Sequence, residues 1–163
     1  MQNQFERKTV VITGACGGMG RAFATAFGRR GAKVGLLDLD QTSLLSFSEE
    51  LTSEDIEVAW AVCDVMDREA CEAAIDSLSE QLGRIDILIN NAGMTHRSLF
   101  EQTSPDVFDK IMGVNYFGSL YCTQFALPRL KASKGSIVVI SSISGFSPLF
   151  GRTGYAASKY ALH

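Results

Sequence analysis

Histidine is scarce in this 163-residue sequence, and no apolar run is long enough to cross a bilayer. The two histidines are His96 and His163, and the four cysteines form no CxxC pair. The ligand spacing of a zinc site is therefore missing, and we expect no metal. The first ten residues are polar, without the apolar stretch of a secretory signal. We expect free thiols in a reducing compartment and a cytoplasmic protein without a transmembrane segment.

Excess charge of either sign is also small. The net charge is -3, and no long basic run is present, so we expect neither nucleic acid nor an anionic membrane as the main partner. With 46% hydrophobic and 20% charged residues, the chain can bury a real core. Its length suits a single domain that spans residues 1–163.

Apolar runs of strand length alternate with segments of helical period. The predicted strands are 9–13, 33–38, 57–63, 85–90 and 136–141. The predicted helices are 21–30, 41–51, 67–82, 105–130 and a last one that begins near residue 152. Strands that are apolar throughout and alternate with helices indicate a parallel sheet covered on both faces. The pattern predicts an α/β fold of the Rossmann type, a doubly wound parallel sheet.

Several residues are placed to begin or end these helices. Asp40 and Asp67 are candidate N-caps, and Ser104 followed by Pro105 forms an expected N-cap and first helical residue. Gly31 is placed to end the first helix.

Glycines gather where the first strand runs into the first helix, in the segment TGACGGMG at 13–20. Glycine lets the chain turn sharply and lets the backbone approach a pyrophosphate, which the amides and dipole of the helix N-terminus attract. The spacing differs from GxGxxG, and a glycine cluster alone is a weak signal, but its position between strand and helix strengthens it. We predict that the cofactor contacts Gly14, Cys16, Gly17, Gly18, Met19 and Gly20.

Asp38 ends the second predicted strand. A carboxylate there can accept hydrogen bonds from both hydroxyls of an adenosine ribose and would repel a 2′-phosphate. No basic residue stands at 15–17, and Leu39 follows. Asp38 is also a candidate cap for the next helix, although Asp40 is better placed for that role. We therefore predict NAD as the cofactor and disfavour NADP.

The remaining motifs resemble the short-chain dehydrogenase/reductase family over residues 8–163. They are TGxxxGxG at 13–20, Asp64-Val65 after the third strand, NNAG at 90–93 with Asn91, Ala92 and Gly93, Asn115 in the long helix, Ser142 after the fifth strand, and YxxxK with Tyr155 and Lys159. Taken alone, each has an ordinary structural explanation, and Ser141 or Ser144 competes with Ser142. Their common order and spacing carry the resemblance.

This resemblance implies hydride transfer between NAD(H) and an alcohol or ketone, with Tyr155 as acid/base. Tyr155 and Lys159 are four residues apart and share a helix face. An ordinary phenol has a pKa of about 10 and is a poor base at neutral pH, but a nearby ammonium favours the phenolate. By resemblance, both residues contact the cofactor, Ser142 holds the substrate oxygen, and Asn115 relays protons through water.

Two alternatives remain beside an active enzyme. A non-catalytic nucleotide-binding or regulatory protein would keep the fold, and loss of Tyr155 or Lys159 would have favoured it. An inactive fragment of the enzyme is the other. The resemblance implies further strands and helices after His163, so we expect a domain incomplete at its C-terminus, truncated before the last strands. We also expect an exposed fifth strand, 136–141, and poor catalysis by this chain itself.

The predicted helix 105–130 carries apolar residues on more than one face, although a surface helix needs only one apolar stripe. The resemblance implies that this helix pairs with its copy, in a homodimer or homotetramer. The substrate is left open. Phe146, Pro148, Leu149 and Phe150 are candidates either for an apolar pocket or for the core, and a steroid, a lipid-derived ketone, a sugar and a small alcohol all remain.

Overall fold

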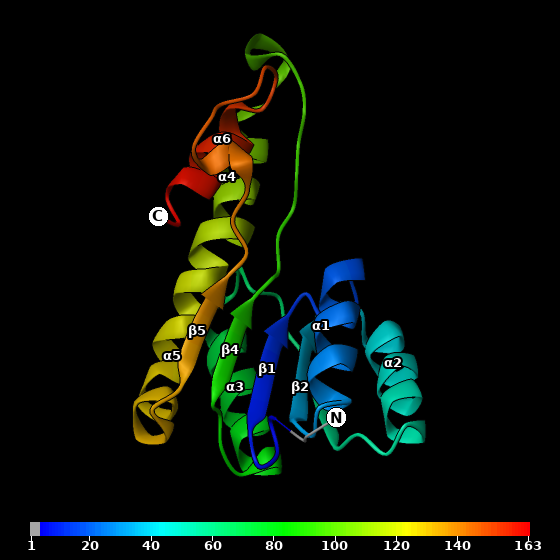
Figure 1. The fold of residues 1–163 in the computed structure, drawn as a ribbon. Helices are drawn as coiled ribbons and strands as arrows, with labels where there is room; N and C mark the ends of the chain where they lie inside the picture. Colours follow the sequence, from blue (N-terminus) through cyan, green and yellow to red (C-terminus); the bar gives the residue numbers. More distant parts are fainter. Residues whose placement is uncertain (1–3) are drawn as a thin grey trace.

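The computed structural model describes residues 4–163 and is built on a five-stranded parallel sheet (Figure 1). The strands are β1 (Thr9–Thr13), β2 (Lys33–Asp38), β3 (Val58–Val62), β4 (Ile87–Asn90) and β5 (Ser136–Val139). Their order is β3-β2-β1-β4-β5, and every neighbouring pair is parallel. The predicted doubly wound fold is confirmed. The order reverses between β1 and β4, which is where such sheets bind ligands, outside the carboxyl ends of the strands.

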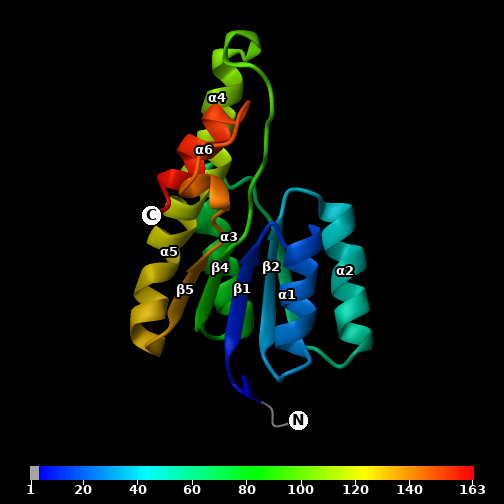
Figure 2. The same ribbon diagram turned by 45° about the horizontal axis from the view of Figure 1, so that its top comes forward.

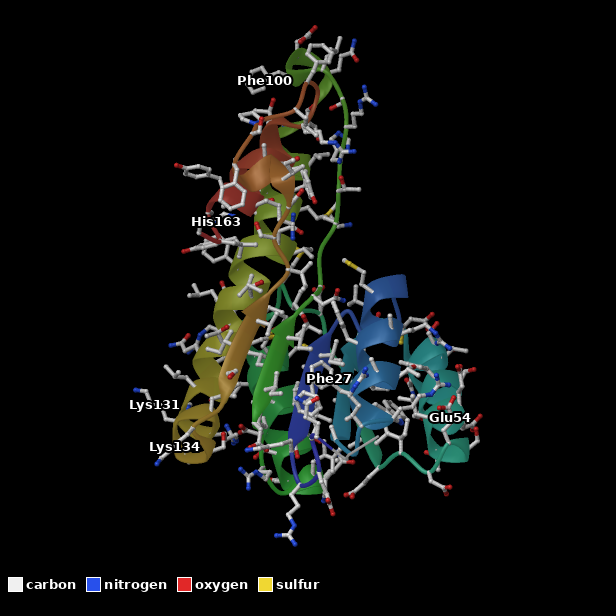
Figure 3. All side chains as sticks on the ribbon, in the orientation of Figure 1. Phe27, Glu54, Phe100, Lys131, Lys134 and His163 are labelled. Atoms are coloured by element: carbon white, nitrogen blue, oxygen red, sulfur yellow. The ribbon has the colours of Figure 1, made fainter. Side chains whose placement is uncertain are left out.

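Helices cover both faces of the sheet. α1 (Gly18–Gly28) and α2 (Gln41–Ser53) lie on one face, and α3 (Arg68–Leu82) and α5 (Gly118–Ser133) lie on the other (Figure 1). Beyond the carboxyl ends of the strands stand α4 (Pro105–Met112) and α6 (Thr153–Tyr160), which pack together (Figure 2). Phe100 lies at the far end of this extension, in the short helix η1 (Phe100–Gln102), whereas Lys131 and Lys134 lie at the opposite end of the molecule (Figure 3).

The core is divided by the sheet into two apolar clusters. Along β1, Val10 and Ile12 join the cluster under α1 and α2, while Val11 joins the cluster under α3 and α5. All three side chains are fully buried, as are Phe47 of α2 and Ile75 of α3. Burial of each such side chain contributes about 1.5–3 kcal/mol to the stability of the fold. The glycine segment therefore follows a strand that is held in place by the core.

Several helix ends match the expectations from sequence. The Asp40 and Asp67 side chains each accept two backbone N–H bonds in the first turn of α2 and α3, as predicted. The first helix begins at Gly18, three residues before the predicted start, so its first amides belong to the glycine segment. After this helix, Gly31 adopts a φ of 92°, which turns the chain toward β2.

The long predicted helix is interrupted. Between α4 and α5, residues Gly113–Phe117 form a π-helical turn, η2, which contains Asn115. The expectation of one continuous α-helix is wrong at this point, and turns of this type often occur at functional sites. Ser104 occupies the N-cap position ahead of Pro105, but its side chain makes no capping hydrogen bond.

β5 forms one edge of the sheet, as expected. Its apolar residues Ile137, Val138 and Val139 are 37–41% exposed. Within residues 4–163, no helix combines the length and the apolar character that a membrane crossing requires.

Candidate functional site

The glycine segment after β1 is too tight for side chains at two of its positions. Gly14 has a φ of +61°, and a Cβ there would lie 2.9 Å from Ala92 Cα. A Cβ on Gly20 would lie 2.3 Å from the Gly14 carbonyl oxygen and 2.7 Å from Ala15 Cα. Because both obstacles are backbone atoms, only hydrogen fits at these positions. The loop therefore folds closely over the first turn of α1.

An open cavity of about 670 Å³ lies at the carboxyl ends of β1 to β4, in the volume range of ligand sites. The predicted cofactor residues that line it are Gly14, Cys16, Gly17, Gly18, Met19, Asp38, Asp64, Val65, Asn91, Ala92 and Gly93. Gly20 does not line it but lies buried beneath the loop. Sequence reasoning missed the lining residues Leu39, Asp40, Ser43, Cys63, Met94, Lys110 and Val114. Met94 could have been found, since it directly follows the NNAG motif.

The Asp38 carboxylate faces this cavity and also holds the glycine loop. One oxygen accepts from the Cys16 amide at 2.8 Å, and the other accepts from the Leu39 amide at 2.8 Å. Burial, together with the charge of Asp38, raises the pKa of the Cys16 thiol to about 11, so this cysteine stays protonated at neutral pH. A carboxylate offers about four lone pairs, so Asp38 keeps acceptors for a ligand. Lys110 is the single basic side chain among the described residues that line the cavity.

The NNAG segment is fastened to the glycine loop by hydrogen bonds. Asn91 Nδ2 donates to the carbonyl oxygens of Thr13 and Gly14, both at 3.0 Å. The Thr13 hydroxyl accepts from the amides of Asn91 and Ala92 at 3.0 and 2.9 Å. The two motifs, nearly 80 residues apart, thus form one rigid wall of the cavity.

Asn115, on the π-helical turn, is fully buried and bonds to two segments at once. Its Oδ1 accepts from the Met94 amide at 2.8 Å, and its Nδ2 donates to the Met94 carbonyl at 3.0 Å. The same Nδ2 donates to Ser158 Oγ on α6 at 2.8 Å. Asn115 therefore connects the end of the NNAG segment to the helix that carries Tyr155 and Lys159.

Lys159 is 5% exposed, and its Nζ donates to the Ile140 carbonyl at 2.8 Å. Burial lowers the pKa of this ammonium below its ordinary value. Nζ lies 6.0 Å from the centroid of the Tyr155 ring. A Cβ built on Gly93, which lines the cavity, would lie 3.4 Å from the same Nζ. Lys159 Nζ therefore lies beside Gly93 of the cavity wall, whereas neither Lys159 nor Tyr155 is among the described residues that line the cavity.

Three serines compete at the end of β5. The Ser141 hydroxyl contacts His163 Nε2 at 2.8 Å and the Lys159 carbonyl at 3.4 Å, while Ser144 is 3% exposed. Ser142 Oγ accepts from the Ser144 amide at 3.2 Å, at the start of the short helix η3 (Ile143–Gly145). This arrangement leaves the Ser142 O–H available, which favours Ser142 among the three. His163, the last residue, lies beside this region (Figure 3).

The short chain dehydrogenase family model matches residues 8–163. The meso-2,3-butanediol dehydrogenase of Serratia marcescens is 40% identical over 160 residues, which cover 98% of this chain and 62% of that relative.

Two solved structures superpose closely. A short-chain dehydrogenase/reductase of Burkholderia phymatum in complex with NAD has a TM-score of 0.94 at 30% identity, over 98% of this chain and 57% of that one. An alcohol dehydrogenase of Thermococcus sibiricus complexed with 5-hydroxy-NADP has a TM-score of 0.92 at 30% identity, over 94% and 66%. The chain thus spans less than two thirds of the length of each of these proteins. The match over nearly all of its own residues shows that the chain belongs to the short-chain dehydrogenase family.

Proposed function

We propose that the protein is an oxidoreductase that transfers a hydride between NAD(H) and an alcohol or ketone. The observation that carries this proposal is the cavity wall itself. The glycine loop, Asp38 and the NNAG segment line one space, and Lys159 Nζ lies beside Gly93 of that wall. A dinucleotide fits this wall, because Gly18 presents bare backbone with open space before it, and Asp38 offers acceptors for ribose hydroxyls.

The chemistry proposed for Tyr155 and its neighbours follows from the residues present. The bound nicotinamide supplies or accepts the hydride. Tyr155 exchanges a proton with the substrate oxygen, and the buried ammonium of Lys159 lies 6.0 Å from the centroid of the tyrosine ring. Ser142 donates a hydrogen bond to the same oxygen. Asn115 fixes Met94 and Ser158 on either side of it. The proton relay through water beside Asn115, which is itself fully buried, is proposed from the family resemblance alone.

Cofactor choice is proposed to favour NAD, since Asp38 would repel a 2′-phosphate. The solved relatives carry NAD in one case and 5-hydroxy-NADP in the other, so the proposal for this chain rests on Asp38 alone. We expect NAD(H) to bind at least about tenfold more tightly than NADP(H) in a fluorescence titration, a difference of about 1.4 kcal/mol. Asp38→Asn should remove most of this preference.

Asp40→Asn is the matched control, because it removes a carboxylate from the same cavity wall while Asp38 stays in place. This variant should keep the preference for NAD(H). Equal or tighter binding of NADP(H) by the unaltered protein would contradict the assignment.

A second copy of the chain is the partner that we propose. Three apolar side chains on η2 and α5 are 37–45% exposed, namely Phe117, Leu120 and Leu127. They belong to the predicted helix 105–130, whose sequence is apolar on more than one face. We expect light scattering at micromolar concentration to give the mass of two or four chains. A monomer under these conditions would count against this proposal.

A reducing, cytoplasmic location is also proposed, from the state of the cysteines. All four are free, although Cys71 Sγ lies 3.9 Å from Cys63 Sγ and 3.7 Å from Cys122 Sγ. Fractionation of the source cells would check this location.

A further inference from the structure

Arg152 immediately precedes the helix that carries the proposed catalytic pair. It is the N-cap residue of α6, three residues before Tyr155, and its backbone is not helical, with φ −124° and ψ 33°. The guanidinium carbon lies over the Tyr155 ring, 5.4 Å from the ring centroid. Tyr155 therefore lies between two cations, one of which the proposed proton transfer does not use.

Arg152 is held in place by the loop that follows the NNAG segment. Its Nη1 donates to Thr95 Oγ1, and the preceding residue, Gly151, accepts a hydrogen bond from the Ser98 amide at 2.9 Å. The first turn of α6 and residues 95–98 are thus tied to each other. The guanidinium is consequently fixed beside Tyr155.

This guanidinium lacks a carboxylate partner. In the described part of the chain, Arg21, Arg29, Arg84 and Arg129 each form an ion pair, whereas Arg152 forms none. Its side chain is nevertheless half-buried. Among the described residues, no Arg152 nitrogen is a buried polar atom without a partner, so solvent reaches the four remaining N–H donors and a ligand can replace it there.

The surroundings of Arg152 are polar but contain no acid. A narrow hollow of about 10 Å³, room for a single water molecule, lies between the loop and α6, and His96, Ser98, Arg152 and Tyr155 are among the residues that line it. Among the described residues that line it, none is Asp or Glu. His96 Nε2 contacts Ser98 Oγ at 2.8 Å, so the histidine faces the same pocket wall as Arg152. This hollow is too small for a carboxylate, so a substrate anion would meet the guanidinium from its solvent-accessible side.

We propose that Arg152 binds a carboxylate of the substrate, so that the preferred substrates are short hydroxy acids and the corresponding keto acids. The inference rests on the proposed function, because it takes Tyr155 as the group that meets the substrate oxygen. A guanidinium beside that tyrosine can bind a carboxylate a few bonds from the carbon that exchanges the hydride. Two parallel N–H bonds to the carboxylate would give both affinity and orientation.

The test compares 3-hydroxybutyrate with its methyl ester and with 2-butanol as substrates of the full-length protein, with NAD as oxidant. The three differ mainly at the carboxylate. We expect kcat/KM for the acid to exceed that for the ester by about 10- to 100-fold, the range of a charge-assisted hydrogen bond. Arg152→Gln should abolish this preference, chiefly by raising KM for the acid, and should leave 2-butanol oxidation within about threefold.

Three control variants separate recognition from folding. Arg152→Lys keeps the charge and should retain part of the preference. Thr95→Val removes the hydrogen bond that fixes the guanidinium but keeps its charge, so the preference should fall without being lost. Arg97→Gln removes an exposed charge from the same loop and should leave the preference unchanged.

The outcomes distinguish the inference from the proposed function. Oxidation of 2-butanol without preference for the acid would overturn the inference alone. An equal loss of preference in Arg97→Gln would also overturn it, since the effect would then belong to the general charge of the loop. If none of these compounds, nor any other secondary alcohol, were oxidised, the proposed function would fail and the inference with it.

Discussion

Replacing Tyr155 with phenylalanine is expected to lower kcat by about 10²–10⁴-fold, the usual contribution of a general acid or base. The substitution removes the phenolic oxygen that would exchange a proton with the substrate but keeps the ring between Arg152 and Lys159. The cofactor is proposed to be held elsewhere, by the glycine loop and Asp38. The affinity for NADH, measured by fluorescence titration, should therefore stay within about threefold.

Tyr160→Phe is the matched control for this result. Tyr160 lies on the same helix and is 68% exposed, so removal of its hydroxyl should leave both turnover and NADH affinity unchanged. Near-normal kcat in Tyr155→Phe would show that another group transfers the proton. A parallel loss of NADH binding would instead assign Tyr155 to the cofactor site.

Gly20→Ala is expected to reduce NAD affinity by at least about 100-fold, equivalent to about 2.7 kcal/mol of binding free energy. The new methyl group would meet the Gly14 carbonyl oxygen at 2.3 Å and Ala15 Cα at 2.7 Å. These are backbone atoms, so relief requires the glycine loop to move away from α1. The amides that the loop presents to a pyrophosphate would move with it.

Gly18→Ala provides the comparison for stability. A Cβ at Gly18 meets nothing within 4 Å, and alanine is favoured over glycine within a helix. The cofactor-free Gly18→Ala protein should therefore unfold at the same temperature as the unaltered protein or slightly above it, whereas Gly20→Ala should unfold at a lower temperature. Unaltered NAD affinity in Gly20→Ala would contradict the role assigned to this loop.

The parts of the fold that the sequence predicted are those set by local chemistry. The β-branched run at 9–13 forms the fully buried strand β1, and Asp40 and Asp67 cap their helices through bonds to residues two and three positions ahead. The glycine loop could be placed because strand, glycines and helix are adjacent in sequence. The alternation of strands and helices is likewise visible in the sequence itself, so it was enough to predict the parallel sheet.

The parts that could not be predicted depend on distant contacts. The π-helical turn at Gly113–Phe117 includes Asn115, whose side-chain partners lie 21 and 43 residues away, and no local pattern encodes them. Lys110 lines the cavity only because α4 stands over it. The position of Arg152 over Tyr155 depends in the same way on a loop that begins some 57 residues earlier.

Transfer of deuterium from NADH to a carbonyl carbon tests the central claim most directly. The full-length protein is incubated with NADH deuterated at C4 of the nicotinamide, in each stereochemical form, and with a panel of ketones and keto acids. Mass spectrometry of the alcohol products then locates the label. We predict one deuterium on the carbinol carbon from one of the two forms, and almost none when Tyr155 is replaced by phenylalanine. Tight NADH binding with no deuterium on any product would contradict hydride transfer and would indicate a nucleotide-binding protein without turnover.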